Sequence, residues 1–197
     1  MKRFFLFLML AIAGNAIGES DSTEIEAVLK RDFKARGQAT MDRVPQDGLQ
    51  RLCTESGDKP PAALAKQIEA DQMKTIAFPE GSLLGDWKNG ERIAQGGRGL
   101  TWSDRGDAPN DGSCYNCHQI GPQEMSYGTI GPSLLGFGKK RGNGAEIQRY
   151  VYGKIYNAKA YNACSQMPRL GHSGTLTAEQ IKDLVALLLD PASPVNR

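Results

Sequence analysis

The residues with the clearest chemistry in this sequence are five consecutive ones, Cys114-Tyr-Asn-Cys-His118. Two thiols three positions apart, followed at once by an imidazole, form the pattern through which haem c is attached to a protein. Each thiol can form a thioether to one edge of the porphyrin, and the histidine then binds the iron as the proximal ligand. The pattern predicts one covalent haem c, held by Cys114 and Cys117 and ligated by His118.

Two other kinds of site share a pair of cysteines at this spacing, and the surrounding sequence favours neither. A thioredoxin-like redox pair needs a βαβ context, whereas residues 104–112 read as a polar, turn-rich loop. A zinc site needs two further ligands at close spacing, and the chain has no second Cys-x-x-Cys.

The distal iron ligand must come from a short set of side chains. The chain has two histidines, His118 and His172, and only two methionines follow the motif, Met125 and Met167. Met125 is too close to His118 for the chain to pass around the porphyrin edge. Met167 stands between two predicted helices and precedes Pro168, and methionine is a frequent sixth ligand in cytochromes c. We therefore favour Met167; His172, an open site and a plain core role for Met167 remain alternatives.

The proximal histidine of a haem usually donates its second ring N–H to a carbonyl oxygen, which fixes its tautomer. The segment 131–134 lies at a suitable distance along the chain from His118, and Pro132 has a carbonyl but no N–H. We expect Pro132 to accept this hydrogen bond, and Leu134 and Phe137 to line the haem edge.

The N-terminus has the pattern of a secretory signal peptide. Lys2 and Arg3 precede the apolar stretch 4–13, and small residues follow up to Gly18. Ten apolar residues are too few for a bilayer, which needs about 20, so the pattern predicts a cleaved leader over 1–18 and no membrane anchor. The mature protein is then expected to be soluble and periplasmic. Loss of the leader leaves equal numbers of acidic and basic residues, which does not favour a nucleic-acid partner.

The pattern of apolar residues predicts a mainly α fold without strands. Helices are expected over 86–95, 145–156 and 177–190, the last capped by Thr177 with Gln180 and ended by Pro191. These helices and the motif place a cytochrome domain over 81–197.

The remaining residues, 19–80, are expected to form an N-terminal helical extension. Thr23 and Glu26 fit a capping box, followed by an apolar stripe through Phe33. Further helices are expected around 49–53 and from Pro60 onward. We expect these helices to pack on the cytochrome domain or on a partner.

Four segments together resemble one family of cytochromes. The segments 114–120, 127–136, 164–171 and 181–196 are similar to SoxX, the small cytochrome subunit of the SoxAX complex of bacterial sulfur oxidation. The resemblance is strong from about residue 90 to residue 196. It implies a class I cytochrome c fold with one covalent haem.

The resemblance also implies roles and partners. By position, Cys114 and Cys117 bind haem, His118 is the proximal ligand and Met167 the distal one. A SoxA subunit would carry the catalytic site, which couples thiosulfate oxidatively to a cysteine of the SoxYZ carrier and releases electrons to an acceptor cytochrome c. This chain would be the non-catalytic electron-transfer subunit of that L-cysteine S-thiosulfotransferase, and SoxYZ and the acceptor would bind it transiently.

Two cysteines lie outside the motif, Cys53 and Cys164. In an oxidising compartment an even pair is most simply a disulfide, here between the extension and the methionine loop. The alternative is a free Cys164 that reacts with sulfur species near the haem.

Two other functions remain open from the sequence. A free-standing periplasmic electron carrier needs only an exposed haem edge, whereas an obligate subunit needs an apolar partner surface. A haem enzyme acting alone, such as a peroxidase, needs an open iron site, which ligation by Met167 would block.

Overall fold

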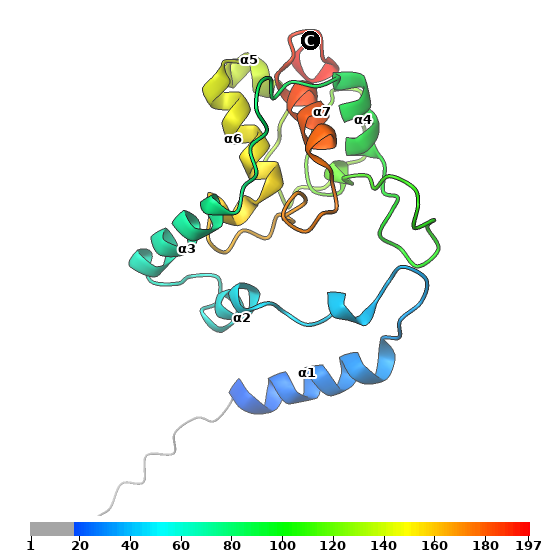
Figure 1. The fold of residues 1–197 in the computed structure, drawn as a ribbon, viewed down its shortest axis with the longest axis vertical. Coiled ribbons are helices and arrows are strands. Elements are labelled where there is room, and N and C mark those ends of the chain that lie inside the picture. Colours follow the sequence, from blue (N-terminus) through cyan, green and yellow to red (C-terminus); the bar gives the residue numbers. More distant parts are fainter. Residues whose placement is uncertain (1–17) are drawn as a thin grey trace, which may run out of the picture.

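The computed structural model describes residues 18–197, and its regular structure is helical (Figure 1). Within these residues, the only β-type pairing is an isolated bridge between Arg36 and Ala39. The α-helices are α1 (Gly18–Asp32), α2 (Gly48–Glu55), α3 (Ala62–Lys74), α4 (Trp87–Gln95), α5 (Phe137–Arg141), α6 (Ala145–Tyr156) and α7 (Ala178–Leu189). The prediction of a mainly α fold is confirmed. Residues 1–17 of the predicted leader lie outside the described part.

The core forms where α4 crosses α7, the most extensive contact between two helices in the described chain. At the crossing, a Cβ added to Gly90 would lie 2.1 Å from the Asp183 carbonyl oxygen, so the two backbones meet directly. The backbone N–H of Asp86 donates to the Asp183 carboxylate at 2.7 Å, which fixes the start of α4 on α7. The helix before the motif and the last helix are thus locked together, an arrangement consistent with a class I cytochrome c fold.

The helix α7 follows the prediction closely. Thr177 and Gln180 form the expected capping box, and Asp190 ends the helix. The buried side chains run through nearly every position from Leu184 to Leu189, because α4 and α6 both pack against it. Helix α6 also has the predicted bounds, Ala145–Tyr156, and contributes the fully buried Tyr152.

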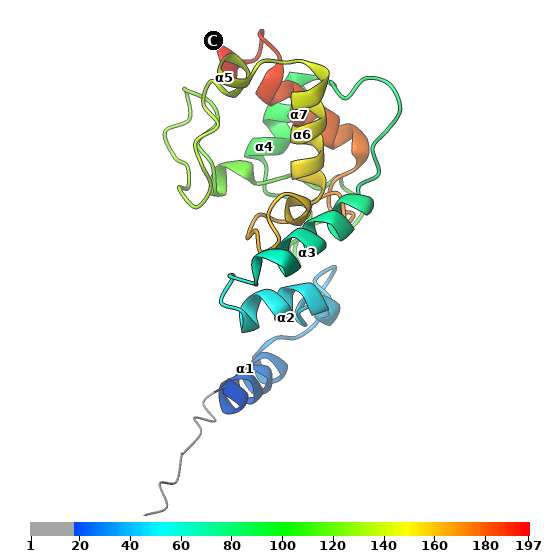
Figure 2. The ribbon, with the colours of Figure 1, turned by 90° about the vertical axis from the view of Figure 1, so that its left-hand side faces the viewer.

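The N-terminal helices form a narrow extension beneath this core (Figures 1 and 2). Helix α3 packs on the short 3₁₀ helix η3 (Ala158–Ala160), and the chain that follows α3 brings Ile76 and Phe78 onto the core. Packing onto the core therefore starts before residue 81. Helix α2 is attached through Cys53, which is buried against Ala163.

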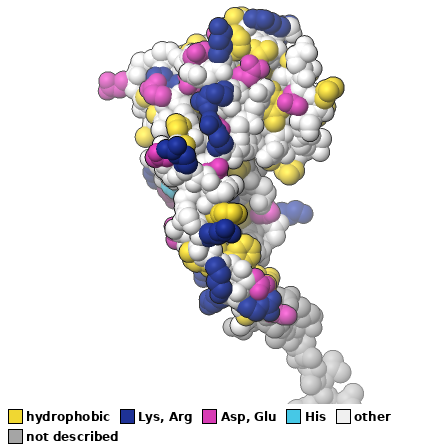
Figure 3. Space-filling model, turned by 90° about the vertical axis from the view of Figure 1, so that its right-hand side faces the viewer, with side chains coloured by type: hydrophobic (Ala, Val, Ile, Leu, Met, Phe, Trp, Pro, Cys, Tyr) yellow, Lys and Arg dark blue, Asp and Glu magenta, His cyan; other side chains and the backbone are white. Residues whose placement is uncertain are grey.

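Helix α1 differs from the expectation in two ways. It begins at Gly18, so Thr23 lies inside the helix and the predicted capping box at its start is wrong. The apolar stripe is also largely exposed, with Ile25 at 59% and Phe33 at 54% of their surfaces open. Figure 3 shows hydrophobic side chains among Lys and Arg on this narrow part of the molecule. The described contacts of the extension with the core come mainly from α2 and α3.

Among the described residues, no helix combines the length and the apolar composition that a membrane crossing requires.

Candidate functional site

The motif residues form a tight turn at the end of the α4 region. Cys114–Asn116 make a 3₁₀ helix (η2), and the backbone N–H of His118 donates to the Cys114 carbonyl at 2.9 Å. Ser113 enters the turn with a left-handed backbone (φ 49°), an uncommon conformation for a residue with a side chain. Its N–H donates to the Gly96 carbonyl at 2.9 Å, and the turn is thereby tied to the end of α4.

A second set of backbone hydrogen bonds ties the motif to the loop that follows it. The Gly128 N–H donates to the Tyr115 carbonyl and the Gly131 N–H to the Cys117 carbonyl, both at 2.8 Å. Because these bonds come from the motif's own backbone, they hold the two cysteine positions and the loop in one rigid unit.

The imidazole of His118 is fixed by the residue predicted for this role. Its Nδ1 atom lies 2.8 Å from the Pro132 carbonyl oxygen. A carbonyl can only accept, so Nδ1 carries a proton, and in the neutral imidazole Nε2 then carries the lone pair. The ring also lies against Gly131, where an added Cβ would come within 2.2 Å of the imidazole Cε1. Only glycine permits this close approach.

Both motif thiols are free and partly buried. Burial raises the pKa of the Cys114 thiol to about 12. Thiol–disulfide oxidoreductases need the opposite, a lowered pKa that makes the thiolate available at neutral pH. The setting of Cys114 therefore works against a thioredoxin-like role for this pair.

Four of the predicted site residues lie on the rim of one apolar cluster. Cys114, Leu134, Phe137 and Met167 are partly buried and pack against the core formed by α4, α6 and α7. Pro132 is exposed. His172, the alternative ligand, is exposed, and Met125, which its nearness to His118 in sequence disfavours, is 95% exposed.

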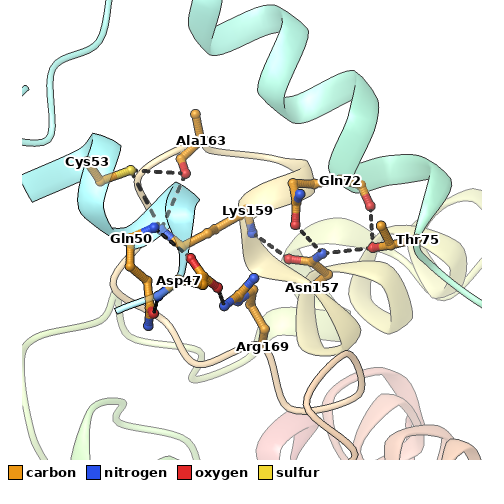
Figure 4. A network of polar contacts seen from close by, with 9 residues as sticks. All are labelled: Asp47, Gln50, Cys53, Gln72, Thr75, Asn157, Lys159, Ala163 and Arg169. Atoms are coloured by element: carbon orange, nitrogen blue, oxygen red, sulfur yellow. Dashed lines mark hydrogen bonds and ion pairs between the residues drawn. The ribbon is translucent and has the colours of Figure 1, made fainter. Parts of the chain in front are cut away.

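Cys53 and Cys164 form a disulfide, with their Cα atoms 5.5 Å apart. It joins α2 to the loop that carries Met167. Figure 4 shows the polar contacts around it, which include an ion pair between Asp47 and Arg169. Lys159 is 6% exposed, and its ammonium Nζ lies 3.8 Å from Cys53 Sγ and 3.4 Å from the Ala163 carbonyl oxygen.

Two groups in this cluster have shifted pKa values, Lys159 and Asp47. Burial lowers the pKa of Lys159, and the nearby charge of Arg169 acts in the same direction. Burial alone would raise the pKa of Asp47, but hydrogen bonds from the Gln50 backbone and from Arg169 outweigh it and lower that pKa.

Several residues that position the site were missed by the sequence reasoning. Asp111 is buried three residues before the motif and accepts from Arg92 at 3.2 Å and from Arg98 at 3.0 Å. Nothing in its local pattern distinguishes it from the other acids of a polar loop. Asp47 caps α2 in a capping box with Gln50, and this spacing was readable in the sequence.

The fold and the site together define the class of protein. It is a mainly helical chain that presents, in one turn, two thiols and an imidazole whose tautomer is fixed by a hydrogen bond.

No protein-family model matches the chain. A protein of Aquifex aeolicus (strain VF5) described as an uncharacterized lipoprotein is 36% identical over 156 residues, which span 77% of this chain and 73% of that protein. The chain belongs to the family of that protein. Among solved structures, it is similar to the crystal structure of SoxXA from P. pantotrophus, with 29% identity and a TM-score of 0.41 over 58% of this chain and 87% of that chain.

Proposed function

We propose that this chain is a monohaem c-type cytochrome that serves as the electron-transfer subunit of a SoxAX complex. One observation carries the haem part of the proposal. The Pro132 carbonyl holds the proton of His118 on Nδ1, so the Nε2 lone pair is available beside two free thiols. A metal-ligating histidine typically has this kind of second hydrogen bond.

The residues present fit haem c. Addition of the Cys114 and Cys117 S–H groups across two porphyrin vinyl groups would give the two thioethers, with no atom lost. His118 Nε2 and the Met167 sulfur would bind the haem iron. Leu134 and Phe137, on the rim of the apolar core, would exclude water from the haem edge. When bound, the haem supplies reversible one-electron transfer.

Surface composition supports a subunit over a free-standing carrier. The loop that follows the motif exposes Met125 at 95%, Ile130 at 82% and Tyr127 at 41% of their surfaces. Apolar and aromatic side chains gathered beside a functional site are typical of partner surfaces. Together with the resemblance to SoxX, this favours a SoxA partner that holds the catalytic site. No catalytic residue is assigned to this chain.

For location, we propose export to the periplasm, based on the leader pattern over 1–18. The Aquifex relative is described as a lipoprotein, so this chain's attachment needs its own test. N-terminal sequencing of the mature protein, with fractionation before and after detergent treatment, distinguishes a cleaved soluble protein from an anchored one.

The haem assignment is tested with matched variants expressed with the haem c maturation machinery. Cys114→Ser with Cys117→Ser should abolish covalent haem, measured by mass and by the absorbance of the denatured, pyridine-treated protein. His118→Ala should lose the ligand field of a proximal histidine, whereas His172→Ala should keep it. Met167→Ala should lose the methionine–iron charge-transfer band, whereas Met125→Ala should keep it. A Met167→Ala spectrum identical to that of the unmodified protein would remove Met167 as ligand.

The subunit role is tested by haem reduction with thiosulfate, the partner SoxA and the SoxYZ carrier, omitting each component in turn. Reduction that requires all of them is expected. Reduction by generic donors but not by an active SoxA would favour a free-standing carrier.

A further inference from the structure

The Cys53–Cys164 disulfide borders a pocket of about 350 Å³ between α2 and the loop 165–169. Cys53 lines this pocket and Cys164 does not. A reagent that enters the pocket therefore approaches the disulfide from the side of Cys53, which is itself 3% exposed. A thiolate that attacks a disulfide forms a mixed disulfide with one of its two sulfurs. The reaction therefore depends on access to the sulfur that is attacked.

The most unusual neighbour of that sulfur is the buried ammonium of Lys159 (Figure 4). It lines the same pocket, its Nζ is 3.8 Å from Cys53 Sγ, and within the described chain it takes part in no ion pair. Its other acceptor is the Ala163 carbonyl oxygen at 3.4 Å. An ammonium has three donors, so a buried one with two long contacts still attracts an anion that enters the pocket.

Two carboxylates oppose the charge of Lys159, those of Asp47 and Asp58, and Asp47 is itself paired with Arg169. A carboxylate oxygen of Asp58 and both disulfide sulfurs lie within 4.8 Å of one another. Asp58 is exposed and accepts from the Gln166 side-chain amide at 2.9 Å, whereas Lys159 is buried. Solvent screens an exposed charge more strongly than a buried one, so Asp58 offsets the attraction of Lys159 for an anion only in part.

We propose that this pocket is a thiol–disulfide exchange site for small anionic thiols, with Cys53 as the sulfur that they attack. Lys159 attracts the incoming thiolate and later stabilises Cys53 as a thiolate. Asp58 moderates both effects.

The exchange proceeds in two balanced steps. First, a small thiolate attacks Cys53 Sγ; the S–S bond to Cys164 breaks, and Cys164 leaves with the electron pair and takes a proton. Second, another molecule of the thiol attacks the mixed disulfide and releases Cys53 as a thiolate beside Lys159. In sum, two small thiols are oxidised to their disulfide and Cys53 and Cys164 are reduced to thiols.

The test equilibrates the full chain, as isolated, with glutathione buffers of increasing ratio of thiol to disulfide, then traps free thiols with an alkylating reagent. Peptide mapping by mass spectrometry reads Cys53 and Cys164 separately from the motif cysteines. Glutathione is expected to reduce the pair and to form its mixed disulfide at Cys53. Absence of reduction in every buffer, or a mixed disulfide at Cys164, would overturn the proposal.

Four variants separate the effect of the charges near Cys53 from that of a general structural change. Lys159→Met should lower the equilibrium constant for reduction at least about tenfold, because a charge this close to a sulfur is worth that much even at the effective dielectric of a protein. Lys159→Arg should remain close to the unmodified protein. Lys154→Met is the matched control, since the Lys154 amine also lies 3.4 Å from a carbonyl oxygen, that of Ala158. Lys154→Met should change the equilibrium constant for reduction less than about twofold.

Asp58→Asn should act in the opposite direction and ease reduction about twofold or more. Asp58 has a left-handed backbone (φ 59°), which asparagine adopts readily, so the variant should fold normally. Far-ultraviolet circular dichroism checks each variant for native helix. Equal constants for the folded Lys159→Met and Lys154→Met variants would sink the proposal.

Discussion

The α4–α7 crossing and the attachment of the extension hold the chain together by different means. At the crossing, apolar side chains and bare backbone meet directly, and Gly90 sets the closeness of approach. The extension is instead held by a disulfide, an ion pair and side-chain hydrogen bonds. Most of these contacts reach residues 157–169, and a second group joins Gln38 and Arg43 to the carbonyl oxygens of Thr101 and Leu100. Dense apolar packing makes the core a single unit, whereas the extension can be detached by breaking a few specific bonds.

The largest effect should come from the crossing itself. In Gly90→Val, the new side chain would collide with the Asp183 backbone, and neither backbone can move without parting α4 from α7. We expect a loss of about 4 kcal/mol or more in the free energy of unfolding, measured by urea denaturation. Gly144→Ala is the control, because an added Cβ there meets no atom within 4 Å. Unchanged stability of the Gly90→Val protein would contradict direct contact between the backbones of α4 and α7 at Gly90.

Removal of the disulfide sharpens the contrast between the two regions. Cys53→Ser with Cys164→Ser opens a loop of sequence separation 111 and should cost about 3 kcal/mol. Hydrogen exchange should increase in α2 and leave α7 protected, because α2 has little other apolar contact with the core. Equal increases in both helices would show that extension and core unfold as one unit.

A smaller effect is expected at Asn157, which joins α3 to the core. Its buried amide donates to the Gln72 side chain at 2.9 Å and to the Thr75 hydroxyl at 3.0 Å. Asn157→Ala leaves these partners without a donor and should cost about 2 kcal/mol by urea denaturation. The exposed Asn143, replaced by alanine, is the control and should change stability little.

The smallest effect belongs to the ion pair of Asp47 with Arg169. The pair is partly exposed, so Asp47→Asn, which preserves the cap on α2, should cost about 0.5 kcal/mol. The folded-state pKa of Asp47 is lowered from its ordinary 3.8. The contribution of the Asp47 carboxylate to the free energy of unfolding is therefore fully present above pH 3.8. It is lost as the pH falls through the lowered pKa. Urea curves near neutral pH and well below 3.8 should differ between the two proteins only at the higher pH.

Local patterns in the sequence predicted the helices of the core well. Thr177 with Gln180, and the apolar spacing over 145–156, specify their helices without help from distant residues, and both elements form with the expected bounds. The Pro132 carbonyl could also be placed, because the chemistry of a haem histidine requires an acceptor and proline has no competing donor.

Features that depend on contacts distant in sequence were not predictable in this way. The burial of Asp111 depends on two arginines brought together by the fold, and that of Lys159 on the meeting of α2 with the loop after η3. The exposure of the α1 stripe was missed for a related reason: apolar periodicity predicts a helix face, but it does not say whether anything covers that face.

The positions of the four cysteines also constrain how the protein is made. Cys53 and Cys164 enclose both motif cysteines between them. Full oxidation of four thiols allows three pairings, and each of them consumes the motif thiols that are free in this structure. Cys114 and Cys117 are close enough in sequence for an oxidant of the compartment to join them in a disulfide before the distant partners meet. On the proposed function, correct maturation therefore requires that the motif thiols stay reduced until haem is attached. The order of these two events, rather than the stability of the finished fold, would then limit the yield of native protein.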